Sequence, residues 1–370
     1  MIEPSLSGRL LFERLLVERR LRMCRSPLFD QPAPHKGHIV APDRVRGMMI
    51  GLAIGDALGN TSEGMNPAER RHHYGEIRDY LPNRYAYGRC LGLPSDDTQL
   101  AFWTLEHLLE NDGRLVPELL AQKFTQRQIF GIGQTVKAFC RAHAAGSIWY
   151  DAAVASAGNG ALMRIAPILL PHLRDGGPDL WVDAAIAGAV THNDHASIAA
   201  CVAFTGMLSA LLVADATPAP NWWIDEYIRL AEPIERGARY RSRGGDFAEF
   251  EGTVSGFVAQ HLSEALQSED SLVSLCNRWH SGAYLLEAVP SVILTLGRYG
   301  ADPEEAILRA VNDTHDNDTA AAIVGAAVGA LHGEKALPAR WRDALRGRTG
   351  MDDDGRVQAL LELAVERFAA

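Results

Sequence analysis

Two short acidic segments, each placed before an apolar helical pattern, carry the residue types best suited to chemistry. Ser95-Asp96-Asp97-Thr98 lies just before LAFWTLEHLL, and His315-Asp316-Asn317-Asp318-Thr319 lies before AAAIVGAAVGAL. Either segment alone could cap its helix, because Ser, Thr and Asp side chains accept hydrogen bonds from free backbone N–H groups of a first turn, and carboxylates suit the positive end of the helix dipole.

A metal site is the alternative to these caps. The helix after the second segment is small and apolar nearly throughout, so carboxylates at its start should be partly desolvated, and without a cation one of them would take a proton. Carboxylate and hydroxyl oxygens, with no His or Cys at metal-binding spacing, select Mg²⁺, Mn²⁺ or Ca²⁺ over Zn²⁺. If the two segments converge, they can hold two ions about 3.5 to 4 Å apart.

Glycines form a second group of candidate positions. Gly47, Gly51 and Gly55 recur every four residues, which lets another backbone approach one helix face closely. Residues 131–133 (GIG) and 158–160 (GNG) expose backbone N–H groups before probable helices. Such groups suit a phosphate or a ribose, although an ordinary turn explains either segment equally well.

Two further segments have both a functional and a structural interpretation. Residues 191–195 (THNDH) could hold zinc through their two histidines, or could form a polar helix entry. Tyr284 could stack on a nucleobase, or could be a core residue of the apolar helix that follows it.

The elements that must position these groups are helices. Apolar residues recur at helical spacing through most of the chain, whereas alternating strand patterns are scarce, so the sequence predicts an all-α fold. Segments 215–222 and 240–246 are predicted to be surface loops. The predicted helices of the main body cover residues 44–57, 98–110, 182–190, 196–213, 284–296, 303–312, 319–331 and 356–368.

The N-terminal residues have a different character. Residues 5–23 (SLSGRLLFERLLVERRLRM) predict one amphipathic helix, and four prolines between residues 27 and 42 predict a linker. We therefore expect an N-terminal arm and linker over residues 1–42 and one domain over residues 43–370.

Bulk properties narrow the class of protein. The 36 Lys and Arg residues against 46 Asp and Glu residues give a net charge of −10, which argues against a nucleic-acid partner. Five widely spaced cysteines without paired spacing favour a reduced cytoplasm. Charges interrupt the first twenty residues, and no later apolar run predicts a membrane span.

Taken together and in order, these segments resemble the ADP-ribosylglycohydrolase family. Each motif is weak alone, whereas the ordered set is specific. The similarity runs through GMMIGLAIGDALGNTSEG at 47–64, SDDTQLAFWTLEHL at 95–108, GIGQT at 131–135, GNGALMRIAPI at 158–168, TH at 191–192 and DNDTAAAIVGAAVGAL at 316–331.

The resemblance implies an orthogonal multi-helix bundle with a binuclear Mg²⁺ site, or one holding Mn²⁺, in a central cleft. The implied metal ligands are Ser95, Asp96, Asp97, Asp316, Asp318 and Thr319, and the implied catalytic residues are Asp97, Glu63 and Asp318. The implied substrate contacts are Gly158, Asn159 and Gly160 and, less securely matched, Gly131, Gly133, His192 and Tyr284. The chain departs from the family at Thr314 and His315, where glycines are common, and this puts the shape of that loop in doubt.

The resemblance further implies an enzyme that removes ADP-ribose from a protein side chain, with arginine favoured. ADP-ribosylserine, O-acetyl-ADP-ribose, a phosphate ester, or mere binding of ADP-ribose by a catalytically silent homologue are the alternatives. Some relatives resemble immunity proteins against ADP-ribosylating toxins, so residues 1–42 either block a cognate toxin or pack on the body of the domain.

Overall fold

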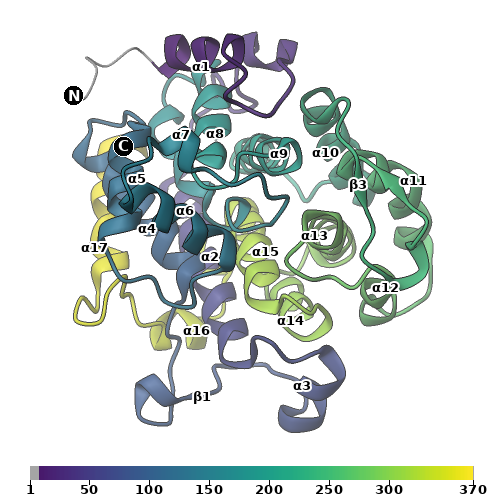
Figure 1. The fold of residues 1–370 in the computed structure, drawn as a ribbon. Helices are drawn as coiled ribbons and strands as arrows, with labels where there is room; N and C mark the ends of the chain where they lie inside the picture. The colour runs from purple at the N-terminus through teal and green to yellow at the C-terminus, as the bar shows by residue number, and fades with distance from the viewer. Residues whose placement is uncertain (1–7, 370) are drawn as a thin grey trace.

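The computed structural model describes residues 8–369, and this part of the chain is predominantly helical (Figure 1). All eight predicted body helices are present, with small differences at their ends; the last becomes a π turn at Val365–Ala369. The α-helices are α1 (Gly8–Val17), α2 (Pro42–Gly59), α3 (Pro67–Tyr74), α4 (Asp96–Glu110), α5 (Pro117–Gln126), α6 (Gln134–Ala144), α7 (Trp149–Ala152), α8 (Asp179–Ala189), α9 (His195–Leu211), α10 (Pro220–Glu235), α11 (Val254–Gln267), α12 (Leu272–Arg278), α13 (Leu285–Tyr299), α14 (Pro303–Asp313), α15 (Asn317–His332), α16 (Ala339–Ala344) and α17 (Arg356–Ala364).

Within residues 8–369, the paired strands form two small antiparallel hairpins, besides three isolated bridges. One pairs β1 (Pro82–Asn83) with β2 (Arg89–Cys90), and the other pairs β3 (Tyr240–Arg241) with β4 (Glu251–Gly252). The loop prediction for 215–222 is wrong at its end, because α10 begins at Pro220, whose fixed φ suits the first helical position. The loop prediction for 240–246 overlooked β3, because a strand of two residues is too short to show an alternating pattern.

Helices α2 and α15 lie against each other at the centre of the molecule (Figure 1). The predicted glycine stripe faces α15: a methyl group on Gly51 would overlap the carbonyl oxygen of Gly325, and one on Gly47 would overlap that of Gly329. At the other end, a methyl group on Gly59 would overlap the backbone of Asp318. The two helices therefore run antiparallel with backbones in contact, and the C-terminal end of α2 lies beside the start of α15.

The remaining helices surround this pair. Helices α8, α9 and α10 pack in sequence on one side, α13 and α14 cover α15, and α4 packs against α2 and α17 (Figure 1). The buried side chains of all these helices form one continuous hydrophobic cluster. Residues 8–369 thus share a single hydrophobic core.

The predicted arm packs on this body in its described part; residues 1–7 lie outside the described residues. Phe12 and Leu15 of α1 are fully buried, and α1 contacts α8. The following segment is also fixed, because the backbone N–H of Cys24 donates to the carbonyl of Ile234 and the His35 ring bonds to Ser209. Of the two alternatives for the arm, packing on the body is the one seen for residues 8–41.

The structure bears on two expectations, the one about unpaired cysteines and the one about membrane-spanning segments. All five cysteines are free thiols. Within residues 8–369, no helix has the length and apolar character that crossing a membrane requires.

Candidate active site

Three helix ends bring buried aspartates together. Asp56 lies near the end of α2, Asp97 in the first turn of α4 and Asp318 in the first turn of α15, and one carboxylate oxygen of each lies within 4.8 Å of the others. The two acidic segments therefore converge, and the α2–α15 contact is what places Asp318 beside the end of α2. We call Asp56, Asp97 and Asp318 the acidic cluster.

Asp56 was not predicted, and its contacts explain why the cap interpretation of the first segment fails. Its carboxylate accepts hydrogen bonds from the backbone N–H groups of Ser95 and Thr98 at 2.8 and 3.0 Å, and from their hydroxyls at 2.6 and 2.5 Å. Ser95 makes no cap of its own, so Asp56 caps α4 from another helix. The only available signal was an acidic residue at the end of the glycine stripe.

This arrangement leaves one carboxylate oxygen of the acidic cluster without a hydrogen-bond partner. Oδ1 of Asp97 is buried and has no hydrogen-bond partner, and no Lys or Arg within residues 8–369 forms an ion pair with Asp56, Asp97 or Asp318. Burial raises the pKa values of Asp97 and Asp318, and the neighbouring carboxylates raise them further. Oxygen donors with an unpartnered buried atom and no protein cation fit a hard divalent ion such as Mg²⁺.

The other predicted acidic residues lie at the rim of the cluster. Burial, together with the charges of Asp56 and Glu63, raises the pKa of Asp96. Asp316 precedes α15 without capping it, and its Oδ2 accepts from Nδ2 of Asn159 at 2.5 Å. Glu63 lies in the turn after α2, and the residue as a whole is exposed. Its carboxyl group is nevertheless partly desolvated, and this desolvation, followed by the charge of Asp316, raises its pKa.

The predicted glycine segments lie on two sides of this rim. Gly131 has a left-handed φ of 66° and lies so close to Asp96 that an added methyl group would be 3.2 Å from its carboxylate. Gly133 has open space around it. Gly158 pairs with Tyr284, and the backbone N–H of Asn159 donates to Ala283 at 2.9 Å. The loop 158–160 is thereby fixed to the start of α13.

His192 and Tyr284 support this loop. The His192 ring packs beneath Gly158 and Gly160, and Nδ1 bonds to Thr191 at 2.8 Å. Burial, then the Arg164 charge, lowers the pKa of His192 to about 3, so the ring is neutral. The zinc alternative for 191–195 gains no support, since Asp194 caps α9 by accepting from the backbone N–H of Ala196.

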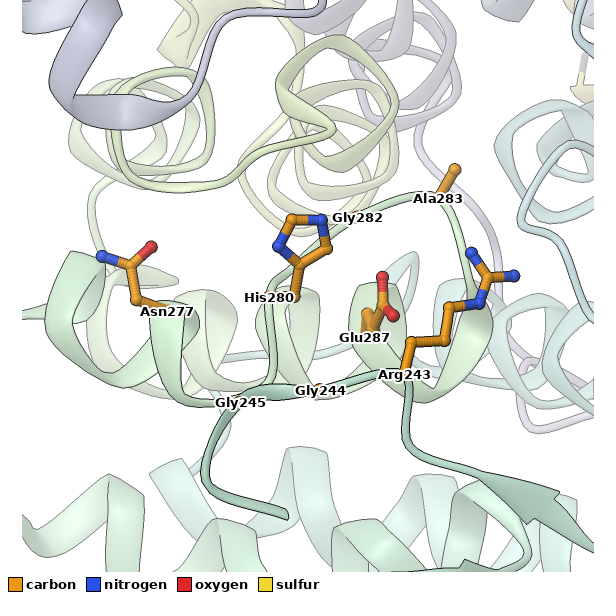
Figure 2. A pocket seen from close by; sticks show the side chains of 8 residues that line it. All are labelled: Arg243, Gly244, Gly245, Asn277, His280, Gly282, Ala283 and Glu287. Carbon is orange, nitrogen blue, oxygen red and sulfur yellow. The ribbon is translucent and has the colours of Figure 1, made fainter. Parts of the chain in front are cut away.

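A cavity of about 340 Å³ lies beside the start of α13 (Figure 2). Glu287, His280 and Arg243 surround it, and the Arg243 guanidinium lies over the Tyr284 ring at 4.2 Å from its centroid. The ring centroids of His280 and His315 are 4.3 Å apart, with the rings tilted by 35°. The loop before α13 also holds the second acidic segment, because the backbone N–H of Asp316 donates to the carbonyl of Ser281 at 3.1 Å.

Residues 38–369 match the family model described as ADP-ribosylglycohydrolase. The chain is 27% identical to the ADP-ribosyl-[dinitrogen reductase] glycohydrolase of Rhodospirillum rubrum, over 87% of this chain and 97% of that protein. It is also 27% identical to the ADP-ribosylarginine hydrolase Tri1 of Pseudomonas putida, over 81% and 74%. A solved structure titled ADP-ribosylglycohydrolase-related protein complex superposes with a TM-score of 0.64 at 26% identity, covering 89% of this chain and 99% of that one.

Proposed function

Because the chain belongs to the ADP-ribosylglycohydrolase family, we propose that it is a Mg²⁺-dependent hydrolase that removes ADP-ribose from a modified protein side chain, with arginine favoured. The observation that carries this proposal is the convergence of buried carboxylates without a cationic partner, next to glycine-rich loops. The relative named as an ADP-ribosylarginine hydrolase supports the choice of arginine.

The proposed ligand set spans the two acidic helix starts. Two ions, Mg²⁺ or Mn²⁺, would be held by Ser95, Asp96 and Asp97 from α4 and by Asp316, Asp318 and Thr319 from α15. Bound there, such ions supply charge that fixes the ribose hydroxyls and lowers the pKa of water. Asp56 contributes differently, since its oxygens already accept four bonds from the start of α4 and fix that turn.

The protein residues have separate tasks in the proposed reaction. Hydrolysis breaks the bond between C1 of the ribose and the side-chain nitrogen, forms a C1–O bond with water, and passes through an oxocarbenium-like state. Asp97 positions the water and accepts its proton, with Glu63 or Asp318 assisting, and the departing guanidine takes a proton. The backbone N–H groups of 131–133 suit the diphosphate, whereas those of Gly158 and Asn159 already bond to Ser156 and Ala283. Tyr284 suits the base.

Substrate assays with and without metal test the proposal. The protein is incubated with ADP-ribosylarginine, ADP-ribosylserine, O-acetyl-ADP-ribose and a phosphodiester, in Mg²⁺ and after thorough chelation. We expect release of ADP-ribose from the arginine conjugate in Mg²⁺ only. Full activity after chelation contradicts the metal scheme, and binding of ADP-ribose without turnover of any substrate indicates a silent homologue.

An immunity role would rest on this activity. If the chain protects its host from an ADP-ribosylating toxin, it would do so by reversing the modification rather than by inserting residues 8–41 into the toxin, since these residues are packed on the body. Toxin binding that is lost on deletion of residues 1–40, with hydrolysis retained, would contradict this assignment.

A further inference from the structure

Arg70 on α3 is a buried cation that binds backbone instead of carboxylates. Its side chain is fully buried, and burial lowers its pKa to about 10, so the guanidinium stays charged at neutral pH. Its terminal nitrogens donate to the carbonyls of Val311 at 2.7 Å, Asn312 at 3.3 Å, Thr314 at 3.0 Å, Met65 at 2.8 Å and His315 at 3.5 Å.

These carbonyls belong to two segments that flank the acidic cluster. Met65 lies two residues after Glu63, in the turn that carries this glutamate. Residues 311–315 end α14 and lead directly into Asp316 and α15. Thr314 and His315, which lie directly before Asp316, are both held by Arg70. A single guanidinium therefore joins both sides of the rim.

We propose that Arg70 is a positioning residue for the metal centre, which holds the Glu63 turn and the Asp316 segment together before Mg²⁺ binds. The inference rests on the proposed Mg²⁺ dependence. Arg70 donates to carbonyls and leaves the carboxylate oxygens of the cluster free for a cation, while the charges of Asp318 and Asp313 favour its charged form. Outer partners of this kind orient ligands that would otherwise relax apart.

The shape of the guanidinium matters as well as its charge. A planar fork can donate to several carbonyls at once, whereas a lysine ammonium keeps the charge but loses the fork geometry. Arg70→Lys therefore separates the two contributions, and Arg70→Met removes both. Because Lys retains the charge and a long stem, it also provides a folded variant if Arg70→Met is unstable.

Arg298, which is less buried than Arg70, provides a control at the far end of α13. Its guanidinium also donates to three carbonyls, those of Ala265, Ser268 and Asp270 at 2.5 to 2.7 Å, but these end α11 and do not border the acidic cluster. Arg298→Met removes the same kind of contact, so it reports the cost in stability without the effect on the metal centre.

The experiment measures Mg²⁺ binding to the whole chain by titration calorimetry, and amide hydrogen exchange in the metal-free proteins. We expect Arg70→Met to weaken Mg²⁺ binding by about 10- to 100-fold, Arg70→Lys to lie between it and the wild type, and Arg298→Met to bind like the wild type. Exchange at residues 311–316 should be faster in Arg70→Met than in Arg298→Met.

The outcomes separate the two proposals. Wild-type affinity in Arg70→Met, or equal weakening in Arg298→Met, overturns the positioning role. If the wild type itself binds no Mg²⁺, the proposed function fails, and hydrogen exchange still decides whether Arg70 fixes this segment: unchanged exchange at residues 311–316 overturns the inference by itself.

Discussion

The two ends of α4 carry buried carboxylates in opposite surroundings. At the start of the helix, Asp97 lies among Asp56 and Asp318 without a basic partner. Near its end, Glu106 accepts from Lys123 and Arg127 at 2.7 Å each, and from Arg356. Burial opposes ionisation of Glu106 too, but its bonds to Lys123 and Arg356 outweigh burial and lower its pKa to about 2, whereas the pKa of Asp97 is raised.

The difference separates a buried carboxylate that is paired with basic residues from one that is not. Glu106 joins α4 to α5 and α17, so it is neutralised by residues of the protein. At the other end of the same helix, no Lys or Arg of residues 8–369 forms an ion pair with Asp97, although a buried carboxylate without such a partner is costly. The missing charge is what an external metal ion would provide, and variants at each end of α4 test this contrast.

The largest effect is expected at the uncompensated end. Asp97→Asn and Asp318→Asn should lower turnover by about 10²- to 10⁴-fold, because each removes a proposed ligand and the proposed base or its assistant. Neither should lower the stability of the metal-free protein, since each removes one repelling carboxylate. Turnover is measured on ADP-ribosylarginine, and stability by thermal unfolding in chelator. Retained activity in either variant would contradict the proposed role of that aspartate and, with it, the contrast between the two ends of α4.

At the compensated end, the expected effect is on stability. Glu106→Gln should lower the free energy of unfolding by about 3 kcal/mol, because it leaves Lys123 buried without its closest partner. The folded pKa of Glu106 lies below its ordinary value of 4.5, so its stabilisation is present above pH 4.5 and is lost as pH falls toward 2. Urea unfolding of wild type and variant at pH 3 and pH 7 measures this difference.

Glu110→Gln is the matched control for Glu106→Gln. Glu110 also pairs with Lys123, but its side chain is 53% exposed, so the pair contributes little. Turnover per folded molecule should be unchanged in both variants. Loss of activity in Glu106→Gln without loss of stability would show that the two ends of α4 are not distinct in role.

The sequence predicted one end of α4 better than the other, for a physical reason. The acidic helix starts are local patterns, and the long helices repeat their apolar spacing often enough to be recognised. The partners of Glu106 come from α5, the segment after it and α17, and Asp56 acts across from α2, so these contacts depend on tertiary packing. Short polar helices such as α3, which carries Arg70, have no periodic signal strong enough to detect.

A third buried carboxylate sharpens the comparison with the smallest expected effect. Glu235, at the end of α10, accepts from the backbone N–H and hydroxyl of Ser255 at 2.9 and 2.7 Å, and its other oxygen has no partner. Burial raises its pKa from 4.5 to about 7 despite these bonds. It has neither the cations of Glu106 nor the acidic cluster around Asp97, and burial is the largest cause of its raised pKa, with a smaller contribution from Asp194.

Glu235→Gln tests the cost of this burial through pH. Because the folded pKa is raised, the favourable contribution of Glu235 is complete below pH 4.5 and is lost as pH rises through about 7. The variant should gain about 1 to 3 kcal/mol in unfolding free energy relative to the wild type between pH 5 and pH 8. Urea unfolding at both pH values measures this gain, and a pH-independent difference would contradict it.

The glycine contacts between α2 and α15 run along the helix pair, from the acidic cluster at one end to Gly47 at the other. Gly47 lies nine residues before Asp56, about 14 Å along the axis, where it touches the backbone of Gly329. A side chain at Gly47 would have to displace the backbone of α15 at Gly329, in the same helix that carries Asp318 in its first turn.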